Sequence, residues 1–99
     1  MTSRLRTTTR VRTHPGEVLR EFMDENGLTI NGLARSLKVP VMRISDIANQ
    51  RRTVTTDTAI RLARYFGTSP QFWLNLQANY DLSVADVKAI EREIQPLSA

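Results

Sequence analysis

The chain has 99 residues, of which 40% are apolar and 24% are charged, and its formal net charge at pH 7 is +4. This length supports one domain with a single modest core, and no apolar run approaches the roughly 18 residues of a membrane span. The basic N-terminus lacks the apolar segment of a secretory signal, and the absence of cysteine excludes disulfides and thiolate chemistry. We therefore expect a cytoplasmic protein without membrane contact.

Basic residues gather in two parts of the chain. Residues 1–13 carry four arginines and no acid, and residues 35–64 carry seven basic side chains against two acids. Such clustering is typical of a nucleic-acid contact. Residues 1–13 are predicted to form a flexible basic N-terminal arm, which either binds DNA phosphates or a minor groove, or instead serves solubility or contacts a partner protein.

The first predicted helix starts at His14 and ends near Asn26-Gly27. His14 suits the N-cap position, Pro15 the first helical position and Glu17 the positive end of the helix dipole. As the only histidine, with no cysteine nearby, His14 is expected to cap this helix rather than to bind a metal or to catalyse a reaction. The inward stripe of this helix is predicted to consist of Val18, Leu19, Phe22 and Met23.

Residues 28–52 are predicted to form two short helices joined by a tight turn. Leu33 and Leu37 are four residues apart, so the first helix presents one apolar stripe. Pro40 has no backbone N–H and therefore suits the first position of the second helix, from about Pro40 to Asn49. This spacing fits a helix-turn-helix, although an ordinary pair of packed helices has the same pattern. The second helix is expected to turn inward Ile44, Ile47 and Ala48.

Three more helices are predicted towards the C-terminus. Thr56 is a candidate N-cap for one that ends at Gly67, and Ser69 caps the next, Pro70 to Tyr80. A last helix follows the Ser83–Asp86 start and stops before Pro96. The Pro70 helix is apolar on two sides, so it needs both the domain core and a second surface, such as another subunit. Its residues predicted to serve the core or a dimer interface are Phe72, Trp73, Leu74, Leu76 and Tyr80.

The central stretch resembles the helix-turn-helix signature of Cro and repressor-type (XRE) regulators. The residues that carry this resemblance are Leu28-Thr29, Leu33-Ala34, Leu37, Val39-Pro40, Ile44-Ser45, Ile47, Asn49 and Arg52. Lys38 stands where that family often has glycine, so Lys38 is expected to adopt a positive φ. Longer stretches are similar to the HigA antitoxins. They are Thr13–Glu17 with Leu19; Ala59, Arg61–Ala63 and Phe66-Gly67; and Ser69–Gln77 with Tyr80–Leu82.

The resemblance implies an all-α, five- to six-helix bundle of the lambda-repressor type. Residues 14–95 would form the DNA-binding domain with C-terminal dimerisation helices. The expected function is that of a homodimeric antitoxin that binds double-stranded operator DNA, represses its own operon and neutralises a HigB/RelE-like mRNA-cleaving toxin. The alternatives are a free-standing XRE-family repressor without a toxin, and a protein-binding module that has lost DNA binding.

Four residues are expected, by the resemblance, to contact base edges: Val41, Met42, Arg43 and Asp46. Arg43 suits guanine, Val41 and Met42 suit a thymine methyl group, and Asp46 suits the amino group of cytosine. Asp46 could instead pair with Arg43, three residues away, and an acid in this position favours the alternative without DNA binding. The expected phosphate contacts are Thr29, Ser45, Arg51, Arg52 and Thr53.

The composition offers little from which to build an enzyme. One histidine, no cysteine, no glycine-rich phosphate loop and no clustered carboxylates leave no candidate nucleophile, metal site or acid–base pair. We therefore expect no catalytic residue, no metal and no cofactor.

Overall fold

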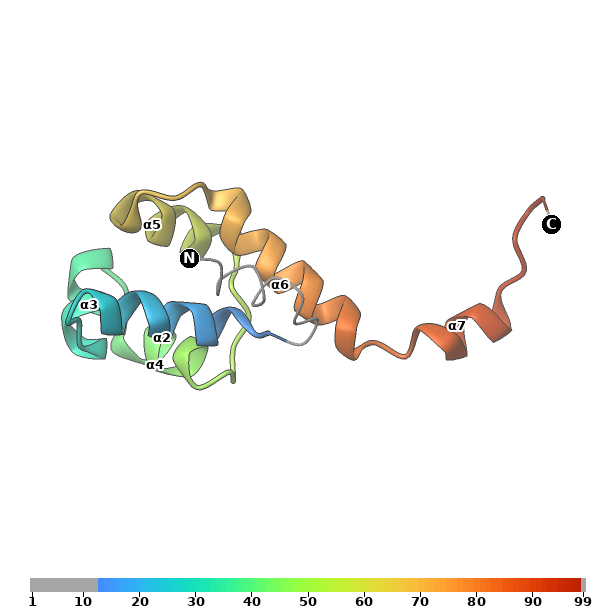
Figure 1. The fold of residues 1–99 in the computed structure, drawn as a ribbon, viewed down its shortest axis with the longest axis horizontal. Helices are drawn as coiled ribbons and strands as arrows, with labels where there is room; N and C mark the ends of the chain where they lie inside the picture. The colour runs from blue at the N-terminus through green and yellow to red at the C-terminus, as the bar shows by residue number, and fades with distance from the viewer. Residues whose placement is uncertain (1–12, 99) are drawn as a thin grey trace.

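A computed structural model describes residues 13–98, which form six helices and no strand. In chain order they are α2 (Pro15–Glu25), α3 (Ile30–Leu37), α4 (Val41–Ala48), α5 (Thr56–Phe66), α6 (Pro70–Val84) and α7 (Val87–Glu93) (Figure 1). The all-α prediction is confirmed. The predicted basic arm, apart from Thr13, lies outside the described residues.

Side-chain caps mark where most of the helices begin. The His14 Nδ1 accepts a hydrogen bond of 2.9 Å from the Gly16 amide, and the Thr29 hydroxyl accepts one of 3.0 Å from the Gly32 amide. Two predicted starts were wrong by one residue. Thr55, not Thr56, caps α5, and Pro40 precedes α4 instead of opening it, because its ψ of 145° is extended.

The turn between α3 and α4 depends on a left-handed residue. Lys38 has φ 60° and ψ 47°, as predicted, and this conformation lets the Val39 amide bond back to the Ala34 carbonyl at 3.1 Å. A lysine accepts this conformation less readily than glycine does, so the turn is held by its neighbours rather than by backbone preference.

Helices α2 to α6 enclose one core, centred on Trp73 (0% exposed). The indole Nε1 donates a 2.9 Å hydrogen bond to the Thr68 hydroxyl, and the ring packs edge-on against Phe22. Helices α2 and α4 approach so closely that a Cβ on Gly16 would lie 2.1 Å from the Ile47 carbonyl oxygen. The other fully buried large side chains are Leu19, Leu33, Ile44, Ile47, Leu62 and Pro15.

Helix α6 differs from its prediction in length and in its buried face. It continues to Val84, because the Ser83 hydroxyl bonds back to the Tyr80 carbonyl at 2.7 Å instead of starting the next helix. Its buried residues are Trp73 and Gln77. Leu74 and Leu76, which lie on different sides of the helix, are both partly buried and pack against the core.

Helix α7 extends away from the body of the molecule (Figure 1). None of its residues is buried, and Asp86 caps it through a 3.1 Å bond from the Ala89 amide. The exposed apolar side chains on α7 and around it are Leu82, Val84, Val87, Ile90, Ile94 and Leu97. Among residues 13–98, no helix has both the length and the apolarity to cross a membrane.

Candidate nucleic-acid interface

Helices α3 and α4 pack against each other through their buried faces. Leu33, Ala34 and Leu37 of α3 and Ile44 and Ile47 of α4 are all at most 5% exposed. They belong to the single hydrophobic core, so the inward face of α4 is rigidly held. The inward orientation predicted for α4 is confirmed.

The first turn of α4 presents apolar side chains to solvent. Val41 is 44% exposed and Met42 is 62% exposed, although both lie on a helix whose other face is fully buried. Val41 and Met42 therefore form a small exposed apolar surface at the N-terminal end of α4.

Arg43 reaches across to α5 instead of pairing within its own helix. Its Nη1 lies 2.7 Å from Oδ2 of Asp57, and Asp57 also accepts a 3.0 Å bond from Nε of Arg61. Arg61 in turn donates to the Leu37 carbonyl at 2.9 Å, which ties α5 to the end of α3. The predicted alternative of an Arg43–Asp46 pair was therefore wrong, because Asp57 provides the carboxylate that Arg43 contacts.

Asp57 is the shared acceptor of this network, and its carboxylate keeps its charge to a lower pH than an isolated aspartate does. Hydrogen bonds from Arg61 and then Arg43 hold the pKa of the Asp57 carboxyl below its ordinary value. Because Asp57 is exposed, this ion pair is screened by solvent, and its main effect is to orient Arg43 rather than to stabilise the fold.

Asp46 faces the loop that follows α4. Its two carboxylate oxygens lie 3.2 Å from the Arg51 guanidinium and 3.5 Å from that of Arg52. Its side chain is only 18% exposed, whereas Arg51 and Arg52 are 61% and 47% exposed. The structure thus brings together one predicted base reader and two predicted phosphate contacts, with the acid less exposed than either arginine.

The hydroxyl groups predicted to contact phosphates lie in different surroundings. The Thr29 hydroxyl accepts a bond from the Gly32 amide, which leaves its own hydrogen for an outside acceptor such as phosphate. Thr53 is exposed in the loop before α5, and Ser45 is half-buried on α4. Within residues 13–98, neither the Ser45 hydroxyl nor the Thr53 hydroxyl donates a hydrogen bond.

Two positioning residues escaped the sequence reasoning. Arg20 donates to the Ala48 carbonyl at 2.8 Å and to the Asn49 side chain at 2.6 Å, so it closes the C-terminal end of α4 from α2. In the same way, Arg61 of α5 donates to the Leu37 carbonyl at the C-terminal end of α3. Both contacts join residues 24 or more positions apart, and no local pattern in the sequence reveals them.

A left-handed turn between two short helices, a second helix with an exposed first turn, and arginines around it define a helix-turn-helix protein. The sequence profile of the helix-turn-helix family matches residues 19–73, and the chain belongs to that family. Its solved structural neighbours include HigA antitoxins, which confirms the resemblance noted in the sequence.

Three relatives illustrate the similarity. Virulence-associated protein I of Dichelobacter nodosus is 49% identical over 74 residues, which are 74% of this chain and 68% of that protein. Antitoxin HigA of Pseudomonas aeruginosa, solved with the higBA promoter, is 49% identical with a TM-score of 0.83, covering 87% of this chain and 98% of the other. A HigA-family addiction module antidote protein of Coxiella burnetii is 45% identical with a TM-score of 0.81, covering 86% and 97%.

Proposed function

We propose that this protein is a sequence-specific DNA-binding antitoxin that represses its own operon from the cytoplasm, as a homodimer without a cofactor or catalytic role. The observation that carries the proposal is the exposed first turn of α4, where Val41 and Met42 project beside Arg43 from a rigidly packed helix. The HigA antitoxin of Pseudomonas aeruginosa, whose structure was solved with the higBA promoter, supports the same use of this fold.

The proposed base contacts are Val41, Met42, Arg43 and Asp46. A short α-helix fits the major groove, and residues at its N-terminal end reach the base edges. Val41 and Met42 would cover thymine methyl groups, and Arg43, directed by Asp57, would donate to guanine. In a dimer the two α4 helices would read half-sites about one helical turn, roughly 34 Å, apart.

The proposed phosphate contacts are Thr29, Ser45, Arg51, Arg52 and Thr53. In the free protein, Arg51 and Arg52 lie against Asp46, so DNA phosphates would compete with this carboxylate for both guanidinium groups. The exchange is favourable because each cation keeps a charged partner while counterions leave the DNA. Asp46 would then be free to accept a hydrogen bond from a cytosine amino group.

Binding to DNA from upstream of the protein's own operon tests this proposal. We expect Met42→Ala and Val41→Ala to lower affinity for that DNA in fluorescence anisotropy, by about 1 kcal/mol each, because each removes apolar surface that would cover a base. Leu82→Ala is the matched control, because Leu82 is similarly exposed (66%) but lies at the end of α6. Equal affinities for all three variants and the wild type would remove α4 from the interface.

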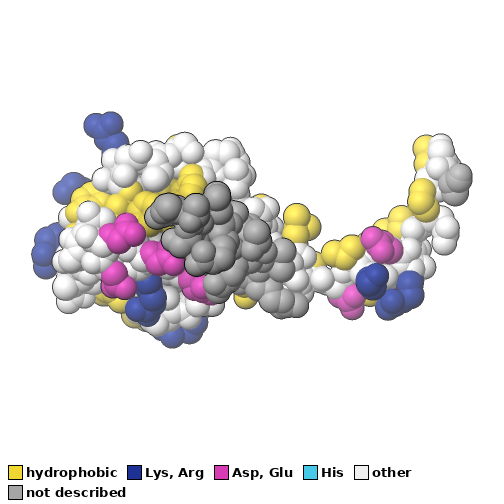
Figure 2. Space-filling model, viewed as in Figure 1, with side chains coloured by type: hydrophobic (Ala, Val, Ile, Leu, Met, Phe, Trp, Pro, Cys, Tyr) yellow, Lys and Arg dark blue, Asp and Glu magenta, His cyan; other side chains and the backbone are white. Residues whose placement is uncertain are grey.

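The second part of the proposal is that the protein neutralises a HigB/RelE-like, mRNA-cleaving toxin. The family of its solved neighbours supports this, and so does the exposed apolar row at the end of α6 and on α7, because such rows mark protein contacts. The space-filling view shows apolar side chains along this extension (Figure 2).

Co-expression with the adjacent reading frame, followed by affinity purification, tests the toxin contact. We expect the two proteins to copurify and the Leu82→Asp/Ile90→Asp variant to lose the partner while it still binds promoter DNA. Promoter binding without any copurifying protein would favour a free-standing repressor. Copurification without promoter binding would favour a protein-binding module.

A further inference from the structure

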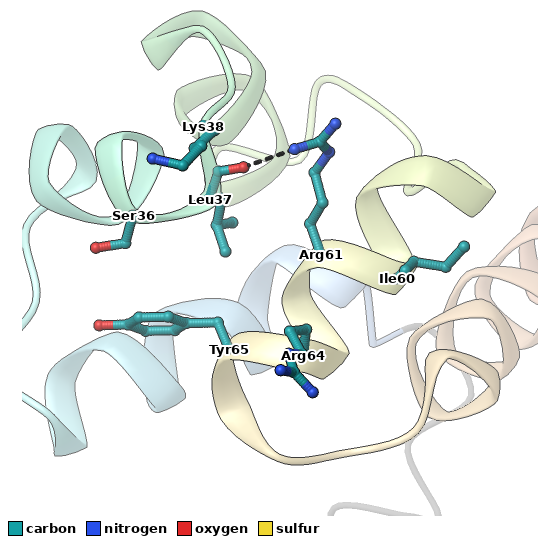
Figure 3. A pocket seen from close by; sticks show the side chains of 7 residues that line it. All are labelled: Ser36, Leu37, Lys38, Ile60, Arg61, Arg64 and Tyr65. Carbon is teal, nitrogen blue, oxygen red and sulfur yellow. Dashed lines mark hydrogen bonds between the residues drawn. The ribbon is translucent and has the colours of Figure 1, made fainter.

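The ring of Tyr65, on α5, separates two surface hollows. One hollow, of about 470 Å³, lies between the end of α3 and α5 (Figure 3). The other, of about 620 Å³, lies between the end of α2 and α5 and has Phe22 and Phe66 in its wall. Tyr65 lines both hollows and is 43% exposed, so its ring forms the ridge between them.

The first hollow is basic. Lys38, Arg61 and Arg64 line it together with Ile60, which is 51% exposed. Arg61 is already committed to Asp57 and to the Leu37 carbonyl. Within residues 13–98, Lys38 and Arg64 form no ion pair, so their charges remain available to an outside group.

The second hollow has one charged lining residue, which is acidic. Glu25 lines it, and the neighbouring Glu21 and Asp24 of α2 are exposed and form no ion pair among the described residues. Arg20, the cation of the same helix, points instead towards the end of α4. In the space-filling view, acidic side chains lie beside a strip of apolar atoms between α2 and α5 (Figure 2).

We propose that this surface is the interface between two copies of the chain. A two-fold rotation about an axis near Tyr65 exchanges the two sides of the ridge, so the basic hollow of each copy would face the acidic hollow of the other. Arg64 of each copy would pair with Glu25 of the other, which gives two such pairs in the dimer. Ile60 and Tyr65 would be covered by the second copy. The charges on the two sides are complementary, as interfaces require for specific pairing.

A DNA backbone fits this surface less well than a second copy does. Phosphates would satisfy Lys38 and Arg64, but they would leave Ile60 uncovered and would be repelled by Glu25 on the other side of Tyr65. The inference rests on the homodimer of the proposed function and specifies the face through which it forms.

Charge reversal in the full-length protein tests the interface by sedimentation equilibrium. We expect Arg64→Glu and Glu25→Arg each to raise the dimer dissociation constant by roughly tenfold or more, because each change places two like-charge pairs in the dimer. The double variant, Arg64→Glu with Glu25→Arg, should regain most of the wild-type affinity. Lys88→Glu and Glu91→Arg on α7 are controls with the same changes in charge.

The possible outcomes separate this inference from the rest of the proposal. A wild-type dimer that neither single variant weakens, or a double variant that is not restored, overturns the Tyr65 interface but leaves DNA and toxin binding standing. Weakening by the α7 controls instead would place the dimer contact on α7. A wild-type protein that is monomeric at all concentrations, yet binds promoter DNA, overturns both the interface and the proposed homodimer. Weakened DNA binding in Arg64→Glu without a change in dimerisation would assign this cation to phosphate.

Discussion

The guanidinium of Arg43, on α4, lies 2.7 Å from the carboxylate of Asp57, on α5. These two residues are 14 positions apart, and their contact links the helix proposed to read DNA to the helix that follows it. Since Asp57 also binds Arg61, whose other partner is the Leu37 carbonyl, the direction of Arg43 depends on three helices.

Removing the Asp57 carboxylate is expected to reduce DNA specificity more than stability. In Asp57→Asn, Arg43 loses its charged partner and the protein gains one positive charge, so affinity for unrelated DNA should rise while discrimination of the promoter falls several-fold. Competition of unlabelled unrelated DNA against labelled promoter DNA measures the discrimination between the two. Glu91→Gln, with the same charge change on α7, is the control, and equal discrimination by both variants would mean that Asp57 does not position Arg43.

Arg51 and Arg52 are expected to bind phosphates and not bases. Their joint replacement by alanine should weaken binding to every DNA sequence and flatten the slope of log K against log salt by about 0.9 for each phosphate that is no longer neutralised. Binding isotherms over a range of salt concentrations provide the slope. If it stays the same, these arginines do not bind the DNA backbone.

Asp46 is expected to restrain the same two arginines in the free protein. Asp46→Asn should release them and raise affinity for unrelated DNA, whereas affinity for the promoter should rise less or fall if Asp46 accepts a hydrogen bond from a base. Anisotropy on both DNAs at one salt concentration compares the two effects. An equal rise in affinity for the promoter and for unrelated DNA would exclude base reading by Asp46.

His14 is expected to make stability depend on pH. Burial lowers the pKa of His14 below its ordinary value of 6.5, more than the charges of Asp81 and Glu17 raise it. The unfolded chain therefore binds a proton at a higher pH than the folded protein does, so the free energy of unfolding is highest above pH 6.5 and falls as the pH drops below it. Protonation of Nδ1 would also remove the acceptor of the Gly16 hydrogen bond.

Urea unfolding at several pH values between about 5 and 7.5, on either side of the ordinary histidine pKa, measures the His14 effect. His14→Asn is the informative comparison, because asparagine caps a helix well but does not titrate. Its stability should change less between these pH values than that of the wild type. A parallel decrease in both proteins would assign the pH dependence to other groups.

Gly16→Ala is expected to destabilise the fold by about 1–3 kcal/mol, because the added Cβ would meet the Ile47 carbonyl oxygen and push α2 from α4. Gly32→Ala is the matched helical control, since its Cβ would meet only the Thr29 hydroxyl, at 3.0 Å. Thermal unfolding compares the two. Similar melting temperatures would show that α2 and α4 can separate at little cost.

The sequence by itself determined the features that depend on neighbouring residues. The cap at His14, the inward stripe of α4 and the helical class all follow from local backbone preferences and apolar spacing, which act within one or two turns. For the same reason, the errors in the starts of α4 and α5 were of a single residue.

Only the tertiary structure decided which charged groups meet and which surfaces stay exposed. The Arg43–Asp57 pair, the Arg20 contact with α4 and the two hollows beside Tyr65 join helices that are distant in the chain. A long, flexible side chain has many possible partners with nearly equal energies, and helix packing selects among them. Packing also placed α7 outside the core. The sequence could not predict this position, because the apolar spacing of a helix is the same whether it packs against its own domain or against a partner.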